Sequence, residues 1–219
     1  MASKAAVKLL KEYASIREWL LDGMMDELGI GQAKLDRLIA SKETRLEKID
    51  LIGADLSGVE LHLADLQSID LMGANLNGAS LFGTGFSQAS LEGATLDFAV
   101  LARCDFSQAT LAEASLEGAD LEQAHLGGAD LSSANLTEAN LKAADLRGAS
   151  CIAANMSEAN LVRADLRGAD LSRANMTDAN MTDALIAKIV RRGANWSGAI
   201  FPNGKVRYRN SRWDIFGGP

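Results

Sequence analysis

The chain has 219 residues, of which 47% are hydrophobic and 23% charged, and its formal net charge is −7 at pH 7. No apolar run is long enough to span a bilayer, and no charged segment followed by an apolar stretch and a cleavage site marks a secretory signal. We therefore expect a soluble, cytoplasmic protein with no membrane partner.

The first 45 residues predict a helical N-terminal arm. Apolar side chains recur at helical spacing over residues 4–28, and Ser3 is a suitable N-cap. After a glycine-rich break at residues 29–31, a shorter helix is expected over residues 32–41. Two helices exceed what one end of a repeat array needs as a cap. Residues 1–45 are thus either a cover for part of the next domain or a docking element.

A period of five residues governs the chain from Leu46 to Ile186. Every fifth position is a large apolar residue in 29 consecutive pentads, and the position two before it is alanine in 23 of them. An α-helix would turn such a period by about 500° per repeat and scatter the leucines around its surface. In extended chain, positions two apart point to the same side, so the small and large residues face inward. The two remaining residues of each pentad must turn the chain.

This pattern, as in the run ADLSG-VELHL-ADLQS-IDLMG-ANLNG, resembles that of the pentapeptide-repeat family. The resemblance implies a right-handed quadrilateral parallel β-helix with four pentads per coil, so that residues 20 apart lie above one another. We therefore expect an all-β solenoid of about seven to eight coils over residues 46–201, with the helical segment before it and a short cap after it. The period of five excludes the hexapeptide β-helix, which hosts acyltransferases.

The spacing of 20 residues also predicts the core. Phe86 and Phe106 fall in one interior column on adjacent coils, where their rings should stack. Cys104 takes an alanine position and Cys151 a leucine position, so both should point inward as small hydrophobic residues rather than take part in redox or metal chemistry.

Near the start of the repeats, outward positions that elsewhere are polar hold four apolar residues and one histidine. They are Ile52, His62, Leu63, Met72 and Phe82. We interpret Ile52, Met72 and Phe82 as a patch that the N-terminal helices cover; the alternative is that this patch docks a partner protein.

Acidic residues concentrate on one face of the predicted solenoid. Residues 46–140 hold two basic and 15 acidic side chains, whereas residues 141–200 hold eight and six. The face built from pentad 54–58 and every fourth pentad after it contains no lysine or arginine. It is either a partner-binding surface or a solvated one, and its asparagine column (Asn135, Asn155, Asn175, Asn195) should bond along the stack. Its outward acids are Asp55, Asp97, Glu117, Glu138, Glu158 and Asp178.

Near the C-terminal end the period falters at Arg191 and returns at Trp196 and Phe201. Residues 202–204, Pro-Asn-Gly, predict a turn, so residues 202–219 form a C-terminal tail or cap. Members of the resembled family can dimerise through this end, so a monomer and a homodimer both remain open.

No set of residues in the sequence suggests catalysis, a metal site or a cofactor. His62 and His125 are predicted three coils apart on the exterior, and a convex rod offers no concavity for a nucleophile and base. We therefore favour a non-enzymatic scaffold that binds a protein through the solenoid faces, the N-terminal helices or both.

The alternative is a DNA mimic that inhibits or protects a type II topoisomerase through its acidic face, as the gyrase-protecting quinolone-resistance members of the resembled family do. Those proteins often carry loops that project from the coils, and the unbroken period leaves no room for such loops here. Direct binding to nucleic acid is not expected under either hypothesis, because the acidic face would repel the phosphate backbone.

Overall fold

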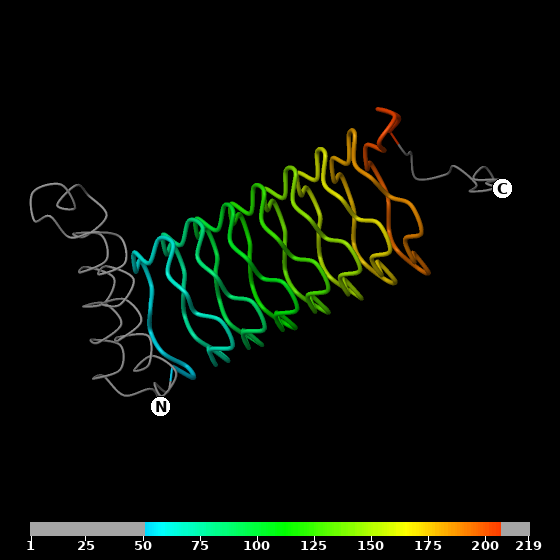
Figure 1. Cartoon of the computed structure of the whole chain (residues 1–219). Helices are drawn as coiled ribbons and strands as arrows, with labels where there is room; N and C mark the ends of the chain where they lie inside the picture. Colours follow the sequence, from blue (N-terminus) through cyan, green and yellow to red (C-terminus); the bar gives the residue numbers. More distant parts are fainter. Residues whose placement is uncertain (1–50, 207–219) are drawn as a thin grey trace, which may run out of the picture.

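The computed structural model describes residues 51–206, which form a rod of stacked coils (Figure 1). The two predicted N-terminal helices, the first pentad and the tail beyond residue 206 lie outside the described residues. Between residues 51 and 206 the backbone alternates turns with single-residue parallel bridges, and no helix there is long and apolar enough to cross a membrane.

The bridges set the register of the rod. Each parallel bridge joins residues 20 apart, from the pair Asp55 and Asn75 to the pair Asn180 and Ile200. Four pentads therefore close one coil, which is the spacing that the sequence predicts. Because no insertion interrupts the ladder, equivalent positions of successive coils form straight columns along the rod.

Each pentad ends in a tight turn. Ala54 N–H donates to the Leu51 carbonyl at 3.0 Å, and Gly53 before it has φ +63°. A positive φ at the third turn residue alone is the pattern of a type II turn. Every fifth residue from Gly53 to Gly198 has a positive φ, and 18 of these are not glycine. A left-handed conformation costs a residue with a Cβ about 1–2 kcal/mol.

The polar position of each pentad has a backbone role that was not predicted from the sequence. In pentad 74–78, four of the five N–H groups donate to backbone carbonyls of the same or an adjacent coil. The fifth, that of Asn77, donates to Oδ1 of Asn75 at 3.1 Å. Aspartate and asparagine prevail at this position because their short side chains carry an acceptor. This acceptor binds the one N–H of the pentad that has no backbone carbonyl as its partner.

The interior follows the predicted columns. The rings of Phe86 and Phe106 stack with centroids 5.0 Å apart and planes 4° apart, as predicted. Cys104 and Cys151 are both buried, and burial raises the pKa of each thiol to about 12. Such thiols stay protonated at neutral pH and behave as packing groups. Thr84, the one buried polar residue recorded between residues 51 and 206, donates its hydroxyl to the Leu61 carbonyl at 2.5 Å.

The last described coil ends in a small hairpin. Arg191 is exposed, whereas Trp196 and Phe201 are buried with ring centroids 5.6 Å apart. Gly204 N–H donates to the Phe201 carbonyl at 2.8 Å, and Val206 bridges Ile200 in antiparallel fashion. The turn predicted at residues 202–204 is therefore confirmed.

Candidate interaction surfaces

The coil has four sides joined by four corners. We name side A after pentad 54–58, side B after 59–63, side C after 64–68 and side D after 69–73, together with the pentads 20, 40 and more residues later. The last two residues of each pentad form the corner that leads to the next side. Side A therefore lies opposite side C, and side B opposite side D.

Five of the six predicted acidic residues share one corner. Asp55 lies in the middle of side A, whereas the others lie on the corner between sides A and B. Asp97 and Glu117 take its first position on two adjacent coils, and Glu138, Glu158 and Asp178 take its second, left-handed position on the next three. We call these five residues the acidic edge. They form two neighbouring columns along a corner rather than a single column on a flat face.

Part of this acidity serves the backbone. Asp97 Oδ1 accepts a bond from Glu117 N–H at 3.0 Å and from the Ser115 hydroxyl at 2.5 Å. The polar position of that pentad holds serine, so Asp97 from the preceding coil supplies the acceptor that an aspartate or asparagine would provide. Asp55 Oδ1 likewise accepts Asn75 Nδ2 at 3.1 Å. Asp55 and Asp97 therefore stabilise the coil whether or not a partner binds.

Glu138 and Glu158 differ from them. Both side chains are exposed on adjacent coils, and within residues 51–206 neither carboxylate takes part in a recorded hydrogen bond or ion pair. Both residues hold a left-handed backbone, with φ 58° and 60°. Their carboxylates are thus available to another molecule.

The asparagine column on side A bonds along the stack, as predicted. Asn175 Nδ2 donates to Asn155 Oδ1 at 2.8 Å. The amide nitrogens of Asn155 and Asn195 likewise donate to the amide oxygen of the asparagine one coil before, each at 3.5 Å. Asn135 at the head of the column donates to Glu117 Oε2 at 3.2 Å. The amide ladder therefore holds one carboxylate of the acidic edge in place.

The predicted apolar patch is not contiguous, and this expectation is corrected. Ile52 and Met72 stand one coil apart on the corner between sides D and A. Phe82 lies ten residues beyond Met72, half a coil away, on the diagonally opposite corner between sides B and C. One surface cannot contain all three residues, because the body of the rod separates them. Any cover by residues 1–45 lies outside the described residues.

A different apolar patch lies across side B. Leu63, Phe82, Phe98 and Val100 stand on three successive coils and are 46, 37, 67 and 40% exposed. We call these four residues the side B patch. Leu63 and Phe82 are among the outward apolar residues noted in the sequence, whereas Phe98 and Val100 were not predicted. The signal was present: Phe98 occupies a turn position that glycine and polar residues dominate, and Val100 occupies the outward polar position.

Room for the bulky corner residues comes from glycines one coil later. A Cβ added at Gly83 would lie 2.6 Å from Leu63 Cδ2, and one added at Gly118 would lie 2.6 Å from Phe98 Cε1. On the same side, the guanidinium carbon of Arg103 lies 5.7 Å from the centre of the Phe82 ring.

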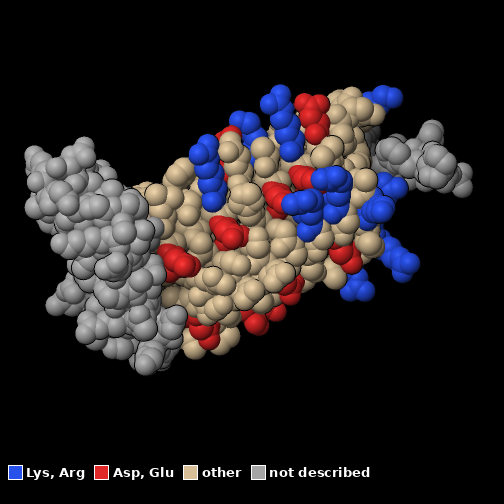
Figure 2. All heavy atoms as spheres, viewed as in Figure 1, with Lys and Arg blue, Asp and Glu red and all other residues tan. Residues whose placement is uncertain are grey.

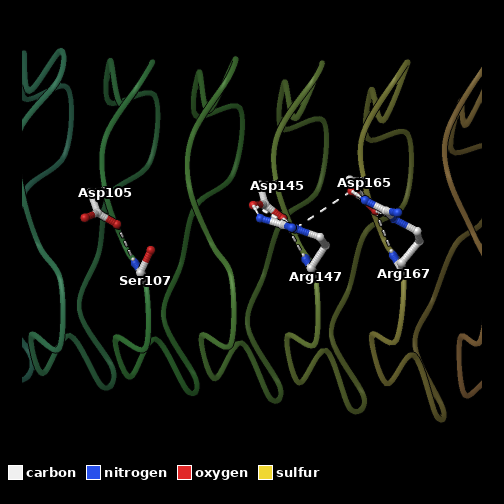
Figure 3. A network of polar contacts seen from close by, with 6 residues as sticks. All are labelled: Asp105, Ser107, Asp145, Arg147, Asp165 and Arg167. Atoms are coloured by element: carbon white, nitrogen blue, oxygen red, sulfur yellow. Dashed lines mark hydrogen bonds and ion pairs between the residues drawn. The ribbon is translucent and has the colours of Figure 1, made fainter.

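Basic residues gather toward the C-terminal half of the rod on the face shown in Figure 2. On side C, Arg147 donates to Asp145 at 2.6 and 2.8 Å, and Arg167 pairs with Asp165 in the same way (Figure 3). Hydrogen bonds from these guanidinium groups hold the pKa of Asp145 and Asp165 below the ordinary range. Each of these two aspartates is thus paired with an arginine of its own pentad, and we call the two pairs the arginine ladder of side C.

Asp105 occupies the equivalent position on side C without an arginine. Ser107 follows it, and Asp105 Oδ1 accepts only the Ser107 N–H among the contacts recorded for residues 51–206, at 2.9 Å. Within the same residues, no group of three or more His, Cys, Asp and Glu side chains could hold a metal ion.

Comparison with known proteins identifies the repeat. The model of the family described as pentapeptide repeats matches in eight copies, over residues 42–78, 79–118, 89–128, 114–150 and 144–183. None of the curated proteins matches this chain significantly.

Several solved structures of pentapeptide repeat proteins are similar to the chain. HetL, involved in heterocyst differentiation regulation in the cyanobacterium Nostoc sp. strain PCC 7120, is 28% identical; the match covers 81% of this chain and 100% of HetL, with a TM-score of 0.27. QnrB1, a plasmid-mediated fluoroquinolone resistance protein, is 22% identical over 66% of this chain and 83% of its own, with a TM-score of 0.29. A protein of the Arabidopsis thaliana thylakoid lumen is 31% identical over 49% of this chain and 68% of its own, with a TM-score of 0.22. The family assignment rests on the repeat match rather than on these superpositions.

Proposed function

The chain belongs to the pentapeptide repeat family, whose members are generally structural or interaction proteins, and from this premise we propose that it is a non-enzymatic scaffold that binds another protein through the sides of its rod. The observation that carries the proposal is the pair of exposed carboxylates of Glu138 and Glu158. They stand on adjacent coils and have no recorded partner within residues 51–206.

These two carboxylates oppose folding slightly. At a coil spacing of about 4.8 Å, two such charges repel by up to about 0.9 kcal/mol in water, and less at physiological salt. The left-handed backbone at both positions adds its own cost. A cationic surface on a partner protein would offset this repulsion. The two carboxylates, which slightly destabilise the free rod, would then stabilise the complex.

The rod is well suited to present such groups. Backbone hydrogen bonds tie every coil to the next, and the polar positions satisfy most of the N–H groups that remain. Little conformational entropy is therefore lost when a partner binds, because the surface is already ordered.

Affinity capture with two forms of the protein tests the proposal. The full chain and a form without residues 1–45 serve as baits, each also made with Glu117, Glu138 and Glu158 changed to Gln. As a matched control, Glu92 and Glu113, which lie on the corner between sides D and A, are changed to Gln. We expect a specific protein to bind both baits and to be lost with the acidic-edge variant alone. A rod that captures no protein in preference to the control surface would refute the scaffold.

The acidic edge also supports the second candidate, a DNA mimic acting on a type II topoisomerase. Its five carboxylates recur once per coil, or about every 4.8 Å, whereas duplex DNA carries one charge per about 1.7 Å of axis. The edge thus has about a third of the charge density of DNA, which is why we favour the scaffold. DNA supercoiling by a type II topoisomerase, measured with and without micromolar protein, decides between them: neither inhibition nor protection would exclude the mimic.

A further inference from the structure

We propose that the side B patch is the docking site for a cationic amphipathic helix of the partner protein. This inference rests on the proposed scaffold function and specifies its binding surface and the chemistry of its partner. The patch is made of Leu63, Phe82, Phe98 and Val100, and it is separate from the carboxylates of Glu138 and Glu158 on later coils.

The side B patch is exposed where folding alone would favour smaller or polar residues. Phe98 is 67% exposed, the largest fraction among the exposed large hydrophobic residues between residues 51 and 206. It also has φ 57°, although its equivalents on the coils before and after, Gly78 and Gly118, are glycine. Phenylalanine at this corner therefore costs backbone strain and exposes apolar area. Aromatic side chains, phenylalanine among them, are enriched at protein interfaces relative to the rest of the surface.

The charge around the patch indicates which kind of partner would bind there. Residues 51–140 hold 13 acidic side chains and one basic side chain, that of Arg103, which stacks on Phe82. Asp97 directly precedes Phe98, and Asp120 stands one coil beyond Val100 in the same column. A second copy that docked patch to patch would bring two acidic surfaces together, and a nucleic acid or an anionic membrane would be repelled. A partner with basic residues beside an apolar stripe fits both features.

The length of the patch fits a helix. Three coils place its outer members about 10 Å apart along the rod, which is close to two turns of an α-helix at a pitch of 5.4 Å. Leu63 and Phe82 lie at the corner of side B with side C, and Phe98 lies at its corner with side A, so such a helix would cross side B obliquely. Its apolar side chains could meet these residues in turn, with lysine or arginine on the flank toward Asp97 and Asp120.

Binding of a synthetic probe tests the surface directly. The probe is a fluorescently labelled 18-residue peptide of leucine and lysine with an amphipathic helical pattern, titrated with the full-length chain and followed by anisotropy. Two control peptides are used: one with every lysine replaced by glutamate, and one with the same composition in a scrambled order that removes the apolar stripe.

The patch variants copy residues that this protein already uses on neighbouring coils. Leu63→Gly copies Gly83, Phe82→Ala copies Ala102, Phe98→Gly copies Gly118, and Val100→Ser copies Ser80. The matched control, Ile152→Ser, removes an exposed apolar residue from the corner between sides D and A and copies Ser132. Circular dichroism melts verify that both variants are folded.

The four patch substitutions are combined in one protein, the quadruple patch variant. We expect the amphipathic basic peptide to bind the wild-type chain and the Ile152→Ser control equally, and to bind the quadruple patch variant about tenfold or more weakly. Equal binding to the patch variant, or equal binding of the scrambled peptide, would overturn the docking site. If a captured partner bound the patch variant undiminished, the inference would fall while the scaffold stood. Capture of no specific protein by the rod would instead remove the scaffold itself.

Discussion

The ring of Phe98 lies over Gly118, its equivalent one coil later, so closely that a Cβ on that glycine would come within 2.6 Å of Cε1. The carboxylate of Asp178 occupies the space above Gly198 in the same way. At these two corners the side chain thus requires a glycine 20 residues on. Neighbouring coils are coupled in sequence even where both residues are on the surface.

This coupling predicts that Gly118→Ala destabilises the protein more than Gly93→Ala. Both substitutions force alanine into a left-handed conformation at a cost of about 1–2 kcal/mol. Only at Gly118 must Phe98 also move, because nothing lies within 4 Å of a Cβ at Gly93. The free energy of unfolding from urea titrations measures the difference. In a Phe98→Gly background the two alanine variants should cost the same, and a difference that persisted there would contradict the coupling.

Leu121→Lys should destabilise the rod severely. Leu121 is 1% exposed, so the substitution buries an unpaired ammonium among leucines at a cost of about 3–5 kcal/mol. Ser133→Lys, at an exposed corner, should change the free energy of unfolding by about 0.5 kcal/mol or less. Equal shifts of the two melting temperatures would show that the assignment of inside and outside is wrong.

Two substitutions of Asp105 distinguish the hydrogen bond that the polar position makes to the backbone from the charge that it carries. Asp105→Asn keeps the acceptor for the Ser107 N–H and should leave stability nearly unchanged. Asp105→Ala leaves that N–H without its acceptor and should cost about 1 kcal/mol. Chemical denaturation of both variants provides the measurement. If alanine and asparagine were equivalent, the preference for aspartate and asparagine at the polar position of the pentads would need another explanation.

The arginine ladder of side C predicts a loss of stability in acid. Because Arg147 and Arg167 hold the pKa of Asp145 and Asp165 below the ordinary value of 3.8, the folded state binds protons less readily than the unfolded state. The stabilisation is therefore complete above pH 3.8 and is lost as the pH falls through the lowered folded values. The double variant Arg147→Gln and Arg167→Gln should flatten the fall of unfolding free energy below pH 4. If the unfolding free energy of the double variant fell below pH 4 as steeply as that of the wild type, the pairs would not stabilise the fold.

Removing charge from the acidic edge should weaken binding without weakening the fold. Changing Glu117, Glu138 and Glu158 to Gln relieves repulsion along the corner, so the melting temperature should stay level or rise slightly. Association with a basic partner should become slower and less dependent on salt. A fall in melting temperature would indicate that these carboxylates support the fold.

The sequence alone predicted the periodic features of this protein. A period of five and a step of 20 residues place Phe86 on Phe106 and Asn155 on Asn175, and both contacts are present. These predictions succeed because every coil is the same length, so a column is fixed once the register is known.

The corners were predicted less well from the sequence. Met72 and Phe82 both point outward and were predicted to share one patch, although half a coil separates them. The acceptor role of Asn75 was not predicted, because it depends on which N–H group has no backbone acceptor. Placement around the rod and hydrogen-bond accounting both need the backbone, since an outward position alone does not say which way it points.

The coils of the rod and the turns of an α-helix laid along it have different spacings. Coils recur about every 4.8 Å, whereas helix turns recur every 5.4 Å, so equivalent positions on the two drift apart by about 0.6 Å per coil. Over three coils the drift stays near 1.2 Å, within the reach of side-chain rotamers, but over eight it would approach a whole turn. A straight helix can therefore follow this rod only over a short stretch, and a partner that engages its full length must do so with segments that restart their register.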